Sequence, residues 1–398
     1  MSSSLTDQLA SELKSLGERD RFRACPNLSG PSRIHVSLDG RHHLSFCSND
    51  YLGLACHPDL SEAAQQAMAL SGFGAGGARL IGGNLPQHRS LEKAIAVLLK
   101  LPRALLFPTG YQANLGVLTA LAGPQDLIVA DRAVHASLID GCRLSRAKLA
   151  IYPHLDLDTA EKHLRRLGPR ARRRFLVTES LFSMDGDLAP LPALASISAT
   201  YDAALLVDEA HAIGTFGPSG AGLCAQYGVV PEILVGTLGK AAGASGAFVA
   251  GSALLCDYLT NRARSFIFTT ALPPSVAAAA EAGLRIIASS QGDSRRQTLR
   301  ALISQLRAEL SLPNDQEPTP IIPVLLGSDG DALHASDRLR TQGFLIPAVR
   351  PPAVREGTSR LRVTLSALHS PDDVSSLAAT LAAYLPPPRA TFRRAKPI

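Results

Sequence analysis

The fold of this chain is most constrained by a run of short apolar segments that alternate with helix-length stretches. Each apolar segment is followed at once by polar or glycine residues, and the segments end at Phe107, Ala130, Thr178, Asp208 and Thr237. Helix-length stretches lie between most of them, at 114–121, 159–167 and 194–201. Strands that are apolar along their whole length are buried on both faces, and helical connections join parallel strands. We therefore predict an α/β fold with a mostly parallel central sheet.

The segments outside this run predict how the chain divides into domains. At 398 residues it exceeds a usual single domain. Leucines at helical spacing predict an N-terminal helix, and Asp39-Gly40 predicts the turn of a hairpin at 33–46. We expect three parts, which are an N-terminal helix and hairpin segment at 1–47, a large α/β domain at 48–288 and a small C-terminal α+β domain at 289–398.

Local patterns predict further elements on either side of the alternating region. Helices are expected at 58–70, 91–100, 276–287, 295–310 and 372–384, and strands near 321–325 and 361–363. The pair Gly292-Asp293 is expected to form a turn that separates two of these helices. Arg360 and Arg362 alternate along the last strand, so one of the two is expected to face solvent.

Charge, cysteine content and hydropathy exclude several classes of protein. The chain carries 40 Lys and Arg against 34 Asp and Glu, a net charge of +6, which weakly favours an anionic ligand and argues against nucleic acid. Its six cysteines include no Cys-x-x-Cys pair, so neither a disulfide framework nor a metal is expected. Asp185 and Asp187 alone could suggest calcium, but no extended ligand loop follows them. Without a signal-peptide core or an apolar run near the ~18 residues of a membrane span, we expect a cytoplasmic protein with no membrane partner.

Three of the predicted strand ends carry residues suited to chemistry. In parallel α/β sheets, ligands bind beyond the carboxyl ends of the strands. A carboxylate and a histidine follow one strand, in Asp208-Glu-Ala-His211, and a lysine follows another, in Thr237-Leu-Gly-Lys240. A third strand leads through Pro108-Thr-Gly-Tyr111 into a helix, and the free N–H groups of such a helix start suit a phosphate.

Together these residues provide what pyridoxal 5′-phosphate (PLP) requires of a protein. A lysine forms a Schiff base with this cofactor, an acid pairs with its ring nitrogen, and a helix start with hydroxyl groups holds its phosphate. Taken singly, each signal has a structural explanation, because an Asp at a strand end is often a helix cap. The combination favours a PLP enzyme in which Lys240 carries the cofactor.

Longer motifs are similar to those of one family. Asp208-Glu-Ala-His211 followed by Thr237-Leu-Gly-Lys-Ala241 resembles the fold-type I PLP enzymes, and the α-oxoamine synthases in particular. The similarity extends over nearly the whole chain, through Ser48-Asn-Asp-Tyr-Leu-Gly-Leu54, Asp131-Arg-Ala-Val-His-Ala-Ser-Leu138, Thr178-Glu-Ser-Leu-Phe-Ser-Met-Asp-Gly-Asp187 and Ser359-Arg-Leu-Arg-Val-Thr-Leu365. The resemblance implies a fold-type I transferase with a large PLP-binding domain and a small C-terminal domain. It also implies an acyltransferase that joins an amino acid to an acyl thioester and releases carbon dioxide.

Within the family, the C-terminal motifs are most similar to members that act in biotin biosynthesis. The discriminating stretch is Ile346-Pro-Ala-Val-Arg-Pro-Pro352 together with 359–365. Those members use L-alanine and a pimeloyl thioester carried by coenzyme A or by acyl carrier protein, and the sequence does not distinguish the two carriers. Three alternatives stay open: a sibling synthase using glycine or serine with another acyl-CoA, a transaminase, and an inactive scaffold or binding protein of the same fold.

The resemblance assigns roles to individual residues. Lys240 corresponds to the Schiff-base lysine and the base that removes the α-proton, His135 to the residue stacked on the cofactor ring, and Asp208 to the partner of the ring nitrogen. His211 and Ser183 correspond to contacts of the phenolic oxygen. The phosphate-side positions are Gly110, Tyr111 and Thr237, and the substrate-side positions are Arg21 (or Arg23), Asn49, His135, Ala353 and Arg362, the last matching the arginine that binds the amino-acid carboxylate.

The sequence departs from the family pattern in two places. The biotin-pathway members commonly have Thr where this chain has Ala353, and small hydroxyl residues are frequent where it has Ala75 and Ala78. The first change implies that a hydroxyl contact to the substrate is lost or supplied elsewhere. By analogy with the family we also expect a homodimer, in which hydroxyls near Thr269-Thr270 reach the phosphate in the neighbouring subunit.

Overall fold

The structure is a computed structural model that describes residues 4–31, 34–313 and 317–384. Its contacts divide the chain into two compact units, one made of residues 49–299 and the other of residues 1–48 together with 300–398. The domain boundaries expected after residues 47 and 288 stay predictions. Residue 33 of the expected hairpin and residues 385–398 of the expected C-terminal domain lie outside the described residues.

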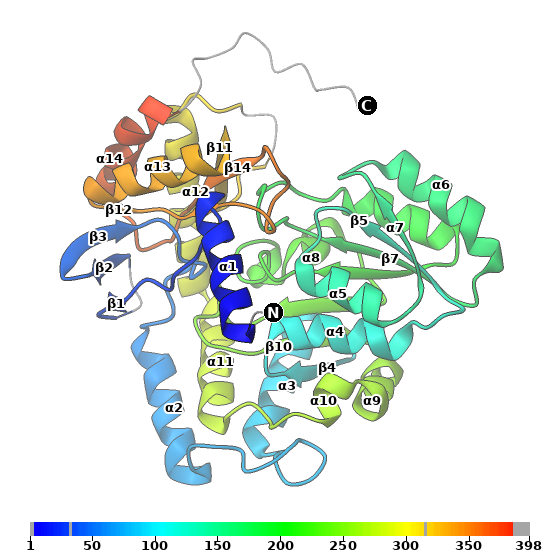
Figure 1. The fold of residues 1–398 in the computed structure, drawn as a ribbon. Coiled ribbons are helices and arrows are strands. Elements are labelled where there is room, and N and C mark those ends of the chain that lie inside the picture. Colours follow the sequence, from blue (N-terminus) through cyan, green and yellow to red (C-terminus); the bar gives the residue numbers. More distant parts are fainter. Residues whose placement is uncertain (1–3, 32–33, 314–316, 385–398) are drawn as a thin grey trace. The chain divides into compact units, whose positions relative to one another are not determined.

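The unit of residues 49–299 contains a seven-stranded sheet with the order β4-β10-β9-β8-β7-β5-β6 (Figure 1). Its strands are β4 (Arg103–Phe107), β5 (Leu127–Asp131), β6 (Lys148–Tyr152), β7 (Arg174–Glu179), β8 (Ala204–Asp208), β9 (Ile233–Thr237) and β10 (Ala247–Gly251). All neighbours from β9 to β6 run parallel, whereas β10 is antiparallel to both β4 and β9. The predicted α/β fold with a mostly parallel sheet is therefore confirmed, and each of the five predicted strands is present.

Two strands of this sheet were missed by the sequence pattern. β6 lies at the sheet edge, and only two of its five residues are buried, so it lacks the continuous apolar run used as the signal. β10 is buried throughout but follows β9 after a short loop instead of a helix. A short loop permits an antiparallel neighbour, which a search for helix-connected parallel strands does not find.

Helices cover the sheet of this unit. The helices that begin in this unit are α2 (Pro58–Ser71), α3 (Pro86–Leu99), α4 (Gly110–Leu121), α5 (Ala136–Leu144), α6 (Leu157–Leu167), α7 (Leu191–Thr200), α8 (Leu223–Tyr227), α9 (Ala253–Arg262), α10 (Arg264–Ile267), α11 (Pro274–Ile287) and α12 (Ser290–Glu309), whose last residues belong to the other unit, with 3₁₀ turns η1 (Gly168–Arg170) and η2 (Pro218–Gly220). Figure 1 shows α4 and α5 on one side of the strands and α6 and α7 on the other. No helix in the described ranges is both long and apolar enough to cross a bilayer.

The other unit holds two smaller sheets in its described part. One has the order β1-β2-β3-β12 and the other β11-β14-β13. Their strands are β1 (Leu28–Ser29), β2 (His35–Leu38), β3 (Arg41–Ser45), β11 (Ile321–Gly327), β12 (Phe344–Leu345), β13 (Ala348–Val349) and β14 (Ser359–Thr364), accompanied by α1 (Leu5–Glu18), α13 (Asp329–Thr341), α14 (Pro371–Leu381) and η3 (Ala382–Tyr384). The predicted N-terminal helix is confirmed. So is the hairpin turn, since Asp39 and Gly40 both have positive φ between β2 and β3.

The turn predicted at Gly292-Asp293 is wrong, because both residues lie inside α12. A glycine at position 292 allows the backbone to pack closely and does not reverse the chain. An added Cβ would lie 2.3 Å from the carbonyl oxygen of Ile287. Asp293 accepts a hydrogen bond from Arg296 at 2.5 Å, an i,i+3 pair within the helix. A Gly-Asp pair therefore marks close packing at this point.

The expectation that one of Arg360 and Arg362 faces solvent is also wrong. Both are buried, with 4% and 6% of their surface exposed. The reason is the position of β14 between β11 and β13, where all six of its residues are buried. Alternation along a strand distinguishes solvent from core only when one face of the sheet is open.

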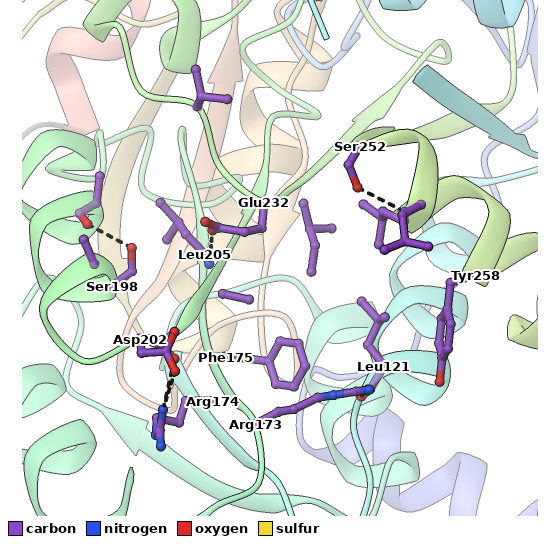
Figure 2. A pocket seen from close by; sticks show the side chains of 18 of the residues that line it. Leu121, Arg173, Arg174, Phe175, Ser198, Asp202, Leu205, Glu232, Ser252 and Tyr258 are labelled. Atoms are coloured by element: carbon purple, nitrogen blue, oxygen red, sulfur yellow. Dashed lines mark hydrogen bonds and ion pairs between the residues drawn. The ribbon is translucent and has the colours of Figure 1, made fainter. Parts of the chain in front are cut away.

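A cavity of about 740 Å³ lies at the amino-terminal ends of β7, β8 and β9 (Figure 2). Phe175 and Leu205 line it, and Figure 2 shows Arg174 turned toward Asp202, with which it forms an ion pair at 3.0 Å. Lys240 follows the carboxyl end of β9, which is the opposite end of the strands. The residues predicted to be catalytic therefore lie at the opposite edge of the sheet from this cavity.

Candidate active site

The candidate site is built where the parallel strands end. Asp208 is the last residue of β8, Glu179 the last of β7 and Thr237 the last of β9, and Lys240 follows three residues later. Because β7, β8 and β9 run parallel, their carboxyl ends lie at one edge of the sheet. The structure thus brings together the lysine and carboxylate that the sequence singled out.

Lys240 lies at one end of a chain of hydrogen bonds. Its Nζ is 2.7 Å from Nε2 of His211, and Nδ1 of that ring is 2.6 Å from the hydroxyl of Tyr51. The Tyr51 hydroxyl donates to Oδ1 of Asn49 at 3.1 Å, so it is left to accept from Nδ1–H of His211. Nε2 of His211 is then the acceptor that faces the lysine amine. Tyr51 is fully buried, which fixes the imidazole in this orientation.

Asp208 is a buried carboxylate held by two donors. Its Oδ2 accepts from Nδ2 of Asn114 at 2.8 Å, and its Oδ1 accepts from the N–H of Ala210 at 2.9 Å. Asn114 lies on α4 and also donates to Oγ of Ser137 at 3.0 Å. These bonds fix the plane of the carboxylate and link β8 to the two helices α4 and α5.

His135 and Ser183 are tied together by the buried carboxyl of Glu179. Oε1 of Glu179 accepts from the N–H of His135 at 2.5 Å, and Oε2 accepts from the N–H of Ser183 at 3.2 Å. Burial, reinforced by the charge of Asp208, raises the pKa of Glu179 to about 8. The three residues come from the ends of two neighbouring strands, so this carboxyl sets their spacing.

The imidazole of His135 is positioned by its own helix. His135 caps α5, with Nδ1 accepting from the N–H of Ser137 at 3.3 Å. His135 is exposed as a residue, yet desolvation by the surrounding protein lowers the pKa of its imidazole. This shift favours the neutral form of the ring.

The start of α4 provides the groups expected on the phosphate side. Thr109 caps the helix, its Oγ1 accepting from the N–H of Gln112 at 3.2 Å. Gly110 begins the helix, and an added Cβ there would meet nothing within 4 Å. The first N–H groups of a helix have no partner within it and carry partial positive charge. An anion can therefore approach the backbone at Gly110 without hindrance.

The two other predicted phosphate-side residues have hydroxyls that make local bonds. Thr237 donates to the carbonyl oxygen of Gly246 at 3.0 Å and accepts from the N–H of Gly239 at 3.2 Å. The Tyr111 hydroxyl donates to Asp140, which raises the pKa of the phenol. The ring of Tyr111 is 44% exposed beside the helix start, so it is open to a ligand.

The chemistry of this set of residues fits PLP. The amine of Lys240 suits covalent attachment of an aldehyde, and the carboxylate of Asp208 suits a protonated ring nitrogen. The open helix start at Gly110 suits the phosphate, and the exposed neutral ring of His135 suits one face of an aromatic ring. All four residues belong to the same compact unit.

Comparison with known proteins agrees with this chemistry. Residues 41–381 match the family of class I and II aminotransferases. The chain belongs to this family. An 8-amino-7-oxononanoate synthase from Methylobacillus flagellatus is 47% identical over 378 residues, which cover 94% of this chain and 94% of that protein.

Two solved structures, a transferase and a synthase, are similar to this chain. They confirm the predicted fold-type I fold. A serine palmitoyltransferase variant from S. paucimobilis with a bound PLP–myriocin aldimine has a TM-score of 0.87 and 28% identity, covering 96% of this chain and 98% of that chain. An 8-amino-7-oxononanoate synthase from Francisella tularensis has a TM-score of 0.73 and 28% identity, covering 86% of this chain and 97% of that chain.

Three of the substrate residues predicted for this family member belong to the unit of residues 1–48 and 300–398. Arg21 donates from Nε to Asp329 at 2.8 Å and from Nη2 to Glu356 at 2.9 Å, which raises the pKa of its guanidinium. Arg362 is buried in β14, and Ala353 is exposed. Their approach to the lysine in the other unit stays a prediction.

Three residues that support the site were not assigned from the sequence, namely Tyr51, Asn114 and Glu179. Tyr51 and Glu179 lie inside motifs that carried the resemblance. Each is a polar residue of such a motif to which no role was given, and that could have marked it as part of the site. Asn114 lies on a helix whose neighbouring residues are apolar, and it is 2% exposed. A buried amide needs hydrogen-bond partners, and here the partner is Asp208.

Proposed function

We propose that this protein is an 8-amino-7-oxononanoate synthase that uses PLP as its cofactor. It joins L-alanine to a pimeloyl thioester and releases carbon dioxide and the free thiol, a reaction of biotin biosynthesis. The observation that carries this proposal is the 47% identity, over 94% of both chains, to a synthase of that name. The arrangement of Lys240, His211 and Asp208 at one sheet edge supports it independently.

Each residue of the site has a defined task in this proposal. PLP, when bound, withdraws electrons from the Cα of the amino acid, so that first a proton and later carbon dioxide can leave. Lys240 would hold the cofactor through its amine, and the start of α4 at Gly110 would bind its phosphate. Asp208 would hold a proton at the ring nitrogen, in the orientation that Asn114 gives it. His135 would lie against the face of the ring.

Lys240 removes the proton from Cα of alanine and returns a proton at the end of the reaction. A general base works best when its pKa lies near the working pH and its lone pair is aimed at the proton. His211 accepts from the lysine amine at 2.7 Å and is itself fixed by Tyr51, so the amine would have one preferred orientation while it is free of the cofactor and acts as the base.

We further propose a cytoplasmic homodimer that binds both substrates. The segment Thr269-Thr270, expected to reach a second subunit, follows one large exposed apolar residue and lies beside a loop that carries two more. Phe73, Ile81 and Phe268 are exposed by 76%, 91% and 69%. Ala78 forms a bridge with Thr270, which places the loop of residues 72–83 beside that segment. Exposed apolar surface of this kind is typical of a subunit interface.

A sibling synthase acting on serine or glycine is the second candidate function. It is favoured by the higher TM-score of the serine palmitoyltransferase, 0.87 against 0.73 for the Francisella tularensis synthase. Backbone likeness reports the fold, whereas substrate choice depends on side chains, and the sequence identity favours the alanine-using reaction. An inactive scaffold is disfavoured because Lys240, Asp208 and His211 are all retained.

An absorbance titration of the purified protein with PLP tests the proposed function. L-Alanine, glycine and L-serine are added in turn, each with and without pimeloyl-CoA, while free thiol and carbon dioxide are measured. We expect the visible band to shift with alanine, and thiol and carbon dioxide to appear only when pimeloyl-CoA is also present. Release that requires glycine or serine would identify a sibling synthase. A protein that develops no cofactor band would be an inactive scaffold.

Two further comparisons complete this experiment. Lys240→Ala should lose the covalently bound cofactor band and the release of thiol, because the variant lacks the Nζ that would form the Schiff base. Replacing pimeloyl-CoA by pimeloyl-acyl carrier protein distinguishes the two carriers by the ratio of their kcat/KM values.

A further inference from the structure

His154 joins the ends of three neighbouring strands. It follows β6, the edge strand, whose neighbours in order are β5 and β7. Its Nδ1 is 2.9 Å from Oδ1 of Asp131, the last residue of β5. Its Nε2 is 2.8 Å from Oδ2 of Asp187, in the loop after β7. The ring thus bridges two carboxylates from different loops.

Both carboxylates depend on this ring for charge compensation. Asp131 is 1% exposed, and its remaining hydrogen bonds come from the backbone N–H groups of Ala133 at 2.7 Å and Leu155 at 2.9 Å. Oδ1 of Asp187 is buried and has no hydrogen-bond partner among the described residues. Burial lowers the pKa of His154, but its bonds to the two carboxylates outweigh that effect and raise it to about 10. The bridge is therefore cationic at neutral pH.

The two bridged loops are those that carry predicted cofactor contacts. Asp131 begins the loop that ends at His135, and its Oδ1 also fixes the N–H of Ala133 within that loop. Asp187 closes a tight turn with Phe182, whose N–H donates to the Asp187 carbonyl oxygen at 3.0 Å, and Ser183 lies inside this turn. The Phe182 ring also meets the His154 ring edge to face, at 4.4 Å between centroids.

We propose that His154 is a positioning residue, whose bridge between Asp131 and Asp187 holds the loops of His135 and Ser183 at the spacing that PLP requires. This proposal rests on the proposed function. It adds a residue that would act through Asp131 and Asp187 and not through the cofactor or the substrate. Glu179 links the same two loops from inside the sheet, through the N–H groups of His135 and Ser183. His154 links them through the side chains of Asp131 and Asp187.

The variant His154→Gln tests the proposal, because an amide keeps the size of the ring but has no positive charge and only one donor group. We expect PLP to bind apoprotein on the order of tenfold more weakly, by analogy with residues that orient the side chains that bind a metal ion. The visible circular dichroism of bound PLP should also change, since it reports the seating of the cofactor. Asp187→Asn should move both readouts in the same direction by less, because Asp131 still pairs with the ring.

Controls separate this proposal from the proposed function and from simple unfolding. His42→Gln, at an exposed histidine of the other unit, should match the parent in every readout. A parent that fails to bind PLP would overturn the proposed function itself. If the parent binds PLP and His154→Gln has the same affinity and dichroism, the positioning role is overturned. Far-UV dichroism of the apoproteins checks the fold, and should His154→Gln fail to fold, Asp187→Asn decides by the same two readouts.

Discussion

At the residue scale, two buried glutamates at the ends of neighbouring strands use their oxygens differently. Glu179 gives each oxygen its own donor, one the N–H of His135 and the other the N–H of Ser183. Glu209 uses a single oxygen, Oε1, for the N–H groups of Leu223 and Cys224, each at 3.1 Å. A glutamine offers one carbonyl oxygen, so it can keep both backbone hydrogen bonds of Glu209 but only one of the two made by Glu179.

We therefore expect Glu179→Gln to lower both the stability and the PLP affinity of the protein. Its amide group would face a backbone N–H, and a buried donor without a partner costs about 1–3 kcal/mol. Urea unfolding of the apoprotein and a PLP titration measure the two effects. Glu209→Gln is the matched control and should keep the parent's PLP affinity. Parent-like values for Glu179→Gln would show that this carboxyl does not set the spacing of the loops.

At the scale of elements, the junction between α11 and α12 depends on close packing of backbone. Arg296 is buried and donates from Nη1 to the carbonyl oxygens of Ile287 at 2.9 Å and Gly214 at 3.2 Å. It thereby satisfies a carbonyl at the end of α11, where the helix provides no donor. Gly292 makes room for this arrangement, because its neighbours are the carbonyl oxygens of Ile286 and Ile287.

Gly292→Ala is expected to destabilise the protein although alanine is the better helix former. The new Cβ would lie 2.3 Å from the oxygen of Ile287 and 2.5 Å from that of Ile286, so the two helices must shift apart. Overpacking of this kind costs roughly 1–3 kcal/mol. The urea midpoint measures it. Gly17→Ala in α1, where an added Cβ meets nothing within 4 Å, should be neutral or stabilising, and equal behaviour of the two variants would contradict the packing argument.

At the scale of the whole molecule, the apolar surface beside Thr269-Thr270 predicts the oligomeric state. Ile81→Asp would bury a charge in the proposed dimer interface and should shift the protein toward monomer with loss of activity. Analytical ultracentrifugation measures the change. Leu254→Asp is the matched control, because Leu254 is 79% exposed and lines the cavity at the amino-terminal ends of the strands. A dimeric Ile81→Asp variant would place the interface elsewhere.

The whole molecule should also lose stability as the pH rises, and His154 should account for part of the loss. Its folded pKa is raised from 6.5 to about 10, so its contribution is fully present below 6.5 and is lost as the pH rises toward 10. Burial raises the pKa of Glu209 to about 7 and that of the Cys142 thiol to about 12, which gives slopes of the same sign between 4.5 and 7 and above 9. Urea midpoints of the apoprotein at increasing pH should fall less steeply for His154→Gln than for the parent. If the urea midpoints of the two proteins fell equally with pH, the positive charge of His154 would not contribute to stability.

The sequence by itself determined the architecture and the identity of the reactive groups. Five buried strands could be predicted because a strand covered on both faces must be apolar along its length. Lys240, Asp208 and His211 were readable because strand ends are where an α/β sheet exposes side chains to a ligand. These features depend on neighbouring residues along the chain, so short sequence patterns are enough to predict them.

Only the tertiary structure decided which side chains support those groups. Asn114 and Asp208 are 94 positions apart, and Tyr51 and His211 are 160 apart, yet each pair shares a hydrogen bond. Both faces of β14 became buried because β11 and β13 come from other parts of the chain. A local pattern records what a segment prefers alone, whereas burial and charge compensation depend on what the fold places beside it.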